Sequence, residues 1–188
     1  MAWQTLEYRI ASVSPMIVHN GQLADPLNKW VKAMKLIHAK RKKTDADLLE
    51  LARLEFLGSL YMDEHGPILP DFMIEATMLN AAKKTKEGPL AKSGLFCTEH
   101  APLIYDGPRS ATELWNDDRF HFSSMVRVGQ SKVSRMRPIF PSWGAIIKLS
   151  YEDGIISEGR INEWVVTGGL QVGLGDWRPR YGRYTLAS

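Results

Sequence analysis

The sequence predicts a single α+β domain built around an antiparallel sheet. Several segments alternate apolar and polar residues with a period of two, which is typical of half-buried strands. Other segments repeat apolar residues every three or four positions, as on one face of a helix. The chain has 188 residues, of which 44% are hydrophobic. This length and composition are sufficient for one compact domain, residues 1–188, with a substantial core.

The first strand is expected from Leu6 to about Val18, where apolar residues alternate with Glu7 and Arg9. The pair Asn20-Gly21 ends this pattern, because such a pair favours a turn.

A helical insertion is expected over residues 26–57. Its first helix places Trp30 and Met34 on one apolar face, with the lysines off that face. Its second helix is expected to begin at Thr44, a favourable N-cap residue followed by acids that suit the first turn. The side chains expected to face inward from this second helix are Leu48, Leu51 and Ala52.

The middle of the chain predicts short elements joined by turns. Residues 58–62 are expected to form a short strand, and residues 66–70 a turn. Asp71 is expected to cap a helix that ends at Lys83-Lys84, where lysines complement the helix dipole. Residues 85–94 are rich in Lys, Gly, Pro and Ser, which indicates a mobile loop, and a short strand is expected from Pro102 to Tyr105.

Two longer strands are predicted over residues 120–128 and 143–151, where apolar and polar residues alternate. Between them, residues 129–141 are basic and irregular, which indicates a protruding hairpin. A helix from about Glu158 to Thr167 and a short strand at Tyr184 end the chain. Without the insertion, the order is strand, helix, strand, strand, helix, strand, which is that of a ferredoxin-like (RRM-like) fold. Such a sheet leaves one face free, and that face binds single strands in RNA-recognition folds.

The most unusual segment is the loop from Gly168 to Tyr184, which holds five glycines, three arginines, one tryptophan and two tyrosines in seventeen residues. A helix C-cap with a tight turn would need only two glycines. Glycine lets a backbone approach a ligand closely, arginine matches phosphate geometry, and aromatic rings stack on bases. We therefore interpret the loop as a nucleic-acid-binding element. Its candidate contacts are Gly173, Gly175, Trp177, Arg178, Arg180, Tyr181 and Arg183.

Charge is segregated along the chain, although the formal net charge is only +3. Residues 26–44 and 125–140 contain no acid, whereas acids concentrate over residues 45–64. One basic run alone is typical of a solvated helix face or hairpin, but three together predict a basic face. The further candidate nucleic-acid contacts are Lys29, Lys32, Lys40, Arg41, Lys42, Lys43, Arg127, Lys132, Arg135 and Arg137.

Three segments resemble the RAMP superfamily, the repeat-associated proteins that form the backbone of class 1 CRISPR effector complexes. The glycine-rich loop from Gly168 to Tyr184 is similar to the loop that precedes the last strand of that family. The segment from Ile68 to Ala82 resembles the entry into the family's first helix. The segment from His19 to Pro26 resembles the loop after strand one, in which some members carry an aspartate that cuts RNA.

The resemblance implies a subunit that self-associates along a single strand, RNA being favoured over DNA, as a homo-oligomer or filament. Other CRISPR-type subunits are further candidate partners. It also implies that the hairpin 129–141 acts as a thumb that inserts between nucleotides near the next subunit. A stand-alone or virus-borne relative, and a viral protein that blocks a defence complex by mimicking one of its subunits, stay open as alternatives.

Two residues are weak candidates for catalysis. His19, at a strand end, has the chemistry of a general acid or base for RNA cleavage, although a turn-capping histidine is the commoner explanation. Asp25 precedes Pro26 and is typical of a helix cap. We therefore expect a binding protein rather than an enzyme, with a metal-independent endoribonuclease of the same fold as the alternative.

Other features argue against several classes of protein. The sequence has no Walker loop, dinucleotide fingerprint or zinc-ligand spacing, so neither a cofactor nor a metal is expected. The single cysteine, Cys97, indicates a reducing, cytoplasmic environment. No run of about 18 apolar residues occurs, and no membrane partner is expected.

Overall fold

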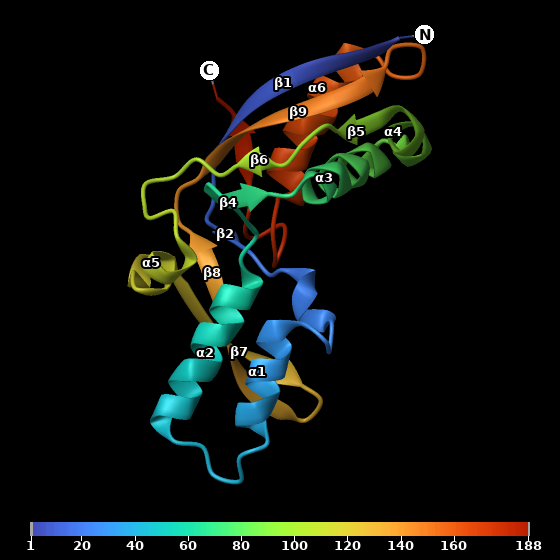
Figure 1. Ribbon diagram of the computed structural model, residues 1–188. Coiled ribbons are helices and arrows are strands. Elements are labelled where there is room, and N and C mark those ends of the chain that lie inside the picture. Colours follow the sequence, from blue (N-terminus) through green and yellow to red (C-terminus); the bar gives the residue numbers. More distant parts are fainter. Residues whose placement is uncertain (1, 188) are drawn as a thin grey trace.

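The computed structural model describes residues 2–187, apart from the side chains of residues 128 and 131. It confirms a mixed α+β chain with antiparallel sheets. The molecule is elongated, with a sheet and its helices at one end and two helices beside a long hairpin at the other (Figure 1). Within the described residues, every helix is too short or too polar to cross a membrane.

The main sheet has four antiparallel strands in the order β10-β1-β9-β5. They are β1 (Trp3–Ser12), β5 (Leu95–Cys97), β9 (Gly144–Glu152) and β10 (Tyr184–Leu186). The longest pairing joins β1 to β9, from Trp3 opposite Glu152 to Ala11 opposite Gly144. Because side chains alternate between the faces of a strand, Tyr8 and Ile10 point to the same face and are buried.

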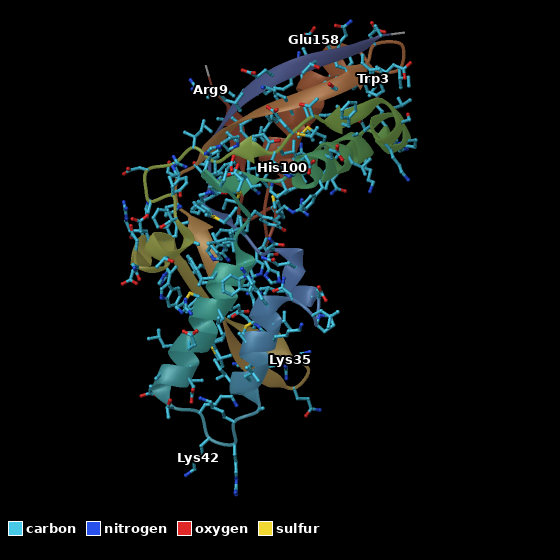
Figure 2. All side chains as sticks on the ribbon, viewed as in Figure 1. Trp3, Arg9, Lys35, Lys42, His100 and Glu158 are labelled. Carbon is cyan, nitrogen blue, oxygen red and sulfur yellow. The ribbon has the colours of Figure 1, made fainter. Side chains whose placement is uncertain are left out.

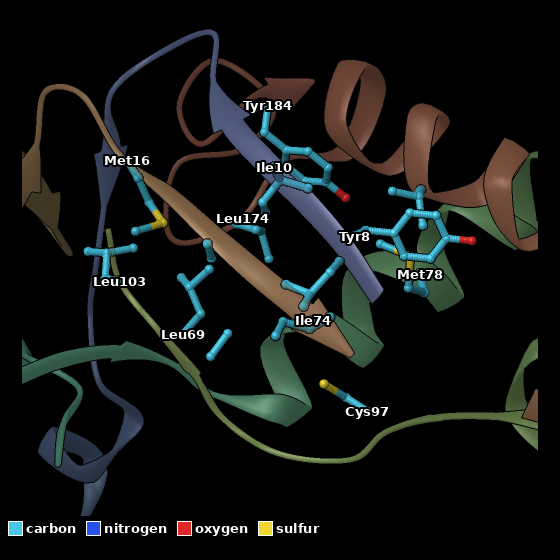
Figure 3. Close-up of a cluster of buried hydrophobic side chains, with 14 of the residues drawn as sticks. Tyr8, Ile10, Met16, Leu69, Ile74, Met78, Cys97, Leu103, Leu174 and Tyr184 are labelled. Carbon is cyan, nitrogen blue, oxygen red and sulfur yellow. The ribbon is translucent and has the colours of Figure 1, made fainter. Parts of the chain in front are cut away.

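Two helices, α3 (Asp71–Lys84) and α6 (Glu158–Thr167), pack together against that buried face. Figure 3 shows part of the core they enclose, with Ile10 of the sheet, Ile74 and Met78 of α3, and Tyr184 of β10. Tyr184 is only 2% exposed. Burial of a large apolar side chain contributes about 1.5–3 kcal/mol, so this core dominates the stability of the sheet end.

The opposite face of the main sheet is open, and Trp3 and Arg9 lie on it (Figure 2). Trp3 packs on Phe96 with the ring centroids 5.0 Å apart. The ammonium group of Lys148 pairs with the carboxylate of Glu99 at 2.9 Å. Charges of both signs therefore mix on this face, and it is not a continuous basic surface.

The other end of the molecule, which we call the arm, consists of four elements. They are α1 (Lys29–His38), α2 (Asp45–Ser59), β7 (His121–Val128) and β8 (Ser131–Phe140). β7 and β8 form a regular antiparallel hairpin, and α2 lies beside β8. The predicted start of α2 is confirmed: Thr44 is its N-cap, and the structure adds a reciprocal capping box between Thr44 and Asp47. The helical insertion and the basic hairpin, expected as separate protrusions, thus pack into one unit.

A short strand, β2 (Met16–Ile17), pairs with β8 and connects the arm to the main sheet. The remaining elements are η1 (Gly21–Ala24), β3 (Met62–Asp63), β4 (Gly66–Leu69), α4 (Gly88–Gly94), β6 (Ala101–Pro102), α5 (Ala111–Trp115), η2 (Asp118–Phe120) and a π-helical segment, η3 (Gly168–Val172).

Several expectations about local structure were wrong. The first strand ends at Ser12, and the chain joins a different sheet at Met16. Residues 85–94, expected to be a mobile loop, include helix α4, whose Gly94 packs closely against Ile156. Residues 131–140 are a regular strand rather than an irregular segment, because each faces a partner in β7 or β2.

Three finer expectations also failed. Leu48 does not face inward but is 53% exposed. Gly58 and Ser59 belong to the last turn of α2 and not to a strand, and the strand in this region is β3. Asp71 is the first residue of α3 rather than its N-cap, which is Pro70.

Candidate nucleic-acid interface

The C-terminal loop, residues 173–183, runs across β2 before the chain enters the main sheet. The backbone N–H of Asp176 donates a hydrogen bond to the carbonyl oxygen of Ile17 at 2.7 Å. The N–H of Gly182 donates to the carbonyl oxygen of Pro15 at 2.8 Å. The loop is therefore fastened at two points, one on β2 and one on the residue before it, in the segment that connects the arm with the main sheet.

The glycines of this loop serve its own packing. Gly175 has a φ of +81°, and a Cβ there would clash with the carbonyl oxygen of Ile17. Gly182 has a φ of +74°, and a Cβ there would clash with the backbone of Leu174. Glycine is required where the backbone takes such a φ and another backbone passes this close. Gly175 therefore has a structural role, and the contact of Gly173 and Gly175 with a ligand stays a prediction.

The two aromatic residues of the loop form a cluster with a residue that sequence reasoning missed, Phe122 of β7. The Phe122 ring lies 5.3 Å from Trp177 and 5.6 Å from Tyr181, measured between ring centroids. Trp177 has a φ of 54°, uncommon for a residue with a side chain, and remains 42% exposed. The alternation along residues 120–128 was the available signal, since it placed Phe122 on one face of the strand.

The arginines of the loop differ in their surroundings. Arg178 and Arg180 are exposed and form no ion pair with any residue that the structure describes. The guanidinium of Arg180 lies 5.8 Å from the ring centroid of Tyr181. Arg183 donates from Nε to the carbonyl oxygen of Pro179 at 2.7 Å, which holds the loop closed. Arg178 and Arg180 therefore lie beside the aromatic cluster where an anion can reach them.

A hollow of about 210 Å³ lies next to Arg178 and is lined by His19, Tyr61, Phe72, Met73, Ala76, Gly175 and Asp176. His19 Nδ1 lies 3.3 Å from the buried hydroxyl of Ser59, and the Tyr61 hydroxyl donates to the His19 carbonyl at 3.2 Å. Burial and then the nearby Arg137 lower the pKa of His19, while Asp176 opposes this shift. The hollow thus presents a histidine whose neutral form is favoured, beside an exposed arginine.

Arg135 and Arg137 do not lie free on the hairpin. Arg137 Nη1 contacts Glu55 Oε1 at 2.7 Å, and Arg135 Nη1 contacts the same oxygen at 3.3 Å. The other oxygen, Oε2, accepts the backbone N–H of Met136 at 3.0 Å. The Arg137 side chain is only 14% exposed. These arginines hold α2 against the edge of β8, and their role as phosphate contacts stays a prediction.

The remaining basic candidates lie on the arm. Lys42 is near its far end, and Lys35 lies on α1 (Figure 2). Lys40 pairs with Asp47 at 2.5 Å, and that hydrogen bond is the largest cause that lowers the pKa of Asp47 to about 2. Lys43 donates to the carbonyl oxygens of residues 38 and 40. The other arm candidates, all exposed, are Lys29, Lys32, Arg41, Lys42, Arg127 and Lys132.

These arm residues form a second group, separate from the C-terminal loop. Arg127 and Lys132 are partners in the β7–β8 register and therefore share one face of the hairpin. Trp177 and Tyr181 contact Phe122, near the base of the same hairpin. The single basic face expected from the sequence is thus divided between the arm and the loop.

Asp25 acts as a turn residue. Its Oδ1 accepts the backbone N–H of Leu27 at 2.8 Å, and the N-cap of α1 is Asn28. Asp25 does not line the hollow that contains His19. In the part of the chain that the structure describes, no three His, Cys, Asp or Glu side chains gather in a way that would hold a metal ion.

No protein-family model matches the chain, and no curated protein sequence matches it.

Proposed function

We propose that this protein binds single-stranded nucleic acid, RNA being favoured, without cutting it, and that it self-associates along the strand. The observation that carries the proposal is the exposed indole of Trp177 beside Arg178 and Arg180. An aromatic face accepts any base by stacking, and a guanidinium offers phosphate a planar pair of donors. The two arginines have no carboxylate partner among the described residues, so they can neutralise a ligand's charge.

The exposed lysines and arginines of the arm support the same proposal through longer-range attraction. Lys29, Lys32, Arg41 and Lys42 face solvent and form no ion pair within the described residues. Cations gathered at one end of a molecule concentrate a polyanion there and speed its association. We assign them to electrostatic attraction and the C-terminal loop to specific contact.

We further propose that the main sheet with α3 and α6 is a ferredoxin-like core of the kind found in RAMP proteins. The strand order β10-β1-β9-β5 supports this, because it places the third core strand between the first and second. In RNA-recognition folds the open sheet face stacks bases. Here that face mixes acids and bases, which favours the C-terminal loop as the contact surface.

A binding measurement tests the proposal. Fluorescence anisotropy of labelled RNA and DNA strands of about 12 nucleotides should show saturable binding to the full chain. Arg178→Ala combined with Arg180→Ala should weaken binding and reduce the slope of log affinity against log salt by about 0.7 per lost contact. Arg9→Ala, on the open sheet face, is the matched control and should leave the affinity unchanged. Undetectable binding of either strand by the wild-type protein at low salt would refute the proposal.

One observation favours RNA cleavage as a second candidate function: the neutral form of His19 is stabilised in a hollow beside Arg178. Neutral imidazole is the form that can accept a proton from a ribose hydroxyl. Incubation of end-labelled RNA with wild-type protein and with His19→Ala, in the presence of a chelator, separates the two functions. Strand scission by the wild type that disappears in the variant would establish the second.

A further inference from the structure

The hollow beside His19 is the first of three that adjoin along one side of α3. A second hollow of about 270 Å³ shares Phe72 and Ala76 with it. A third, of about 480 Å³, shares Leu79 and Lys92 with the second. Hollows with common lining residues are neighbours, and we call the three together the α3 groove.

The floor of the α3 groove is a single stripe of the helix. Phe72, Ala76, Leu79 and Lys83 are spaced four, three and four residues apart, which places them on one helical face. At 1.5 Å per residue, Phe72 and Lys83 are about 16 Å apart along the axis. Phe72 is 56% exposed. The floor therefore begins at an exposed aromatic ring and ends at a cation.

The far end of the groove is rimmed by three lysines, Lys83, Lys86 and Lys92. None of them forms an ion pair with a described residue. The acid nearest to them in the sequence, Glu87, pairs instead with Arg160 at 3.1 Å. The rim is thus an uncompensated positive charge beside an apolar floor.

Two carboxylates also line the groove, and each accepts a backbone hydrogen bond. Glu75 Oε1 accepts the N–H of Cys97 at 2.8 Å, and Asp176 Oδ1 accepts the N–H of Trp177 at 3.0 Å. Asp176 lies at the His19 end and Glu75 lines the middle hollow together with Lys92, whereas Lys83 and Lys86 line only the far hollow. The lysine end is therefore where the groove selects an anion.

We propose that the α3 groove carries the single strand onward from the C-terminal loop, so that phosphates beyond the first contact lie against Lys83, Lys86 and Lys92. This inference rests on the proposed function. A strand with one phosphate per 3.4 Å, as when stacked, covers the 16 Å floor with about five nucleotides. Cations at both ends and an exposed aromatic ring at the start fit a polyanion with bases better than they fit an acidic peptide.

The test depends on strand length. In the triple variant Lys83→Gln, Lys86→Asn and Lys92→Gln, asparagine is chosen at 86 because the φ there is 63° and asparagine tolerates that region. Affinity for a strand of about 12 nucleotides should fall at least tenfold, and the salt slope should shrink by about 2. Affinity for a strand of about three nucleotides, too short to reach from Arg178 to Lys83, should be unchanged.

Lys84→Gln is the matched control, because Lys84 follows Lys83 on the same helix but lies about 100° around it and outside the groove. It should not weaken binding of either strand. If the wild type binds the long strand but the triple variant binds it equally well, the groove proposal fails while the proposed function stands, and an acidic peptide becomes the candidate occupant. If the triple variant loses affinity for both strand lengths equally, the lysines act only through their general positive charge, and the groove proposal also fails.

Discussion

Glu55 and Arg137 form a nearly buried ion pair, 2.7 Å between carboxylate and guanidinium, that joins α2 to β8 across 82 residues of sequence. The same carboxylate accepts the N–H of Met136 at the edge of the strand. A free strand edge is a template for unwanted pairing, and here a helix with an acidic side chain covers it. This contact helps to join the insertion and the hairpin into a single arm.

Removal of one partner of this pair should destabilise the protein. We expect Glu55→Ala to cost about 3–5 kcal/mol of unfolding free energy, because Arg137 would remain buried without a counter-charge. Glu50→Ala is the control: its pair with Arg53 at 2.7 Å is partly exposed on α2, and its loss should cost about 0.5 kcal/mol or less. Urea unfolding of both variants measures the difference, and equal losses would contradict the assignment of Glu55 to the arm's core.

A side chain at position 175 should lower the stability of the fold, and any effect on nucleic-acid binding should follow from that loss. Gly175→Val would force a β-branched residue to a φ of +81° and push its Cβ into the carbonyl oxygen of Ile17. We expect a clear fall in thermal midpoint together with any loss of nucleic-acid binding. Gly159→Ala is the contrasting control, since nothing lies within 4 Å of its Cβ and the position is helical. That change should stabilise the protein by about 0.5–1 kcal/mol.

The features that could be predicted from the sequence are those that depend on residues close together in the chain. The N-cap at Thr44, the alternation in residues 143–151 and the helix from Glu158 are local patterns, and each is present. Helix α4 was missed because its Gly, Pro and Ser content disfavours a helix in isolation. Glycine fits at position 94 because Ile156 packs against it, and this contact joins residues that are far apart in the sequence.

The candidate site was predictable in its residue types and not in its arrangement. Trp177, Arg178 and Arg180 are exposed as their composition indicated. Arg137 looked like its basic neighbours, yet its partner Glu55 lies on a distant helix, so only the fold could place it in the interior. Lys83 was expected at a helix end, and Lys86 and Lys92 in a mobile loop. The turn that brings the three together depends on helix α4.

The stability of the folded protein should depend on pH through His19. Burial and Arg137 lower its pKa below the value of about 6.5 in an unfolded chain, so the unfolded state binds more protons between these two pKa values. Stability therefore rises with pH through this window, is complete above about 6.5 and is lost as the pH falls toward the folded pKa. Across this pH range, the urea midpoint of His19→Gln should change less with pH than the midpoint of the wild type. His65→Gln, whose side chain is 80% exposed, should keep the wild-type slope.

The indole of Trp177 should report nucleic-acid binding directly. Trp177→Ala should weaken binding by about 1–3 kcal/mol if one base stacks on the ring, which corresponds to a loss of roughly 5- to 150-fold. Trp3→Ala, which removes another exposed indole from the open sheet face, is the matched control and should leave the affinity unchanged. The two variants discriminate between the two aromatic surfaces of the molecule. If only Trp3→Ala lowers the affinity, the contact lies on the open sheet face, where RNA-recognition folds place it. The C-terminal loop would then not belong to the interface. The fluorescence change on adding an oligonucleotide to the wild type should be absent in Trp177→Phe, because the chain's other indoles lie outside the proposed contact.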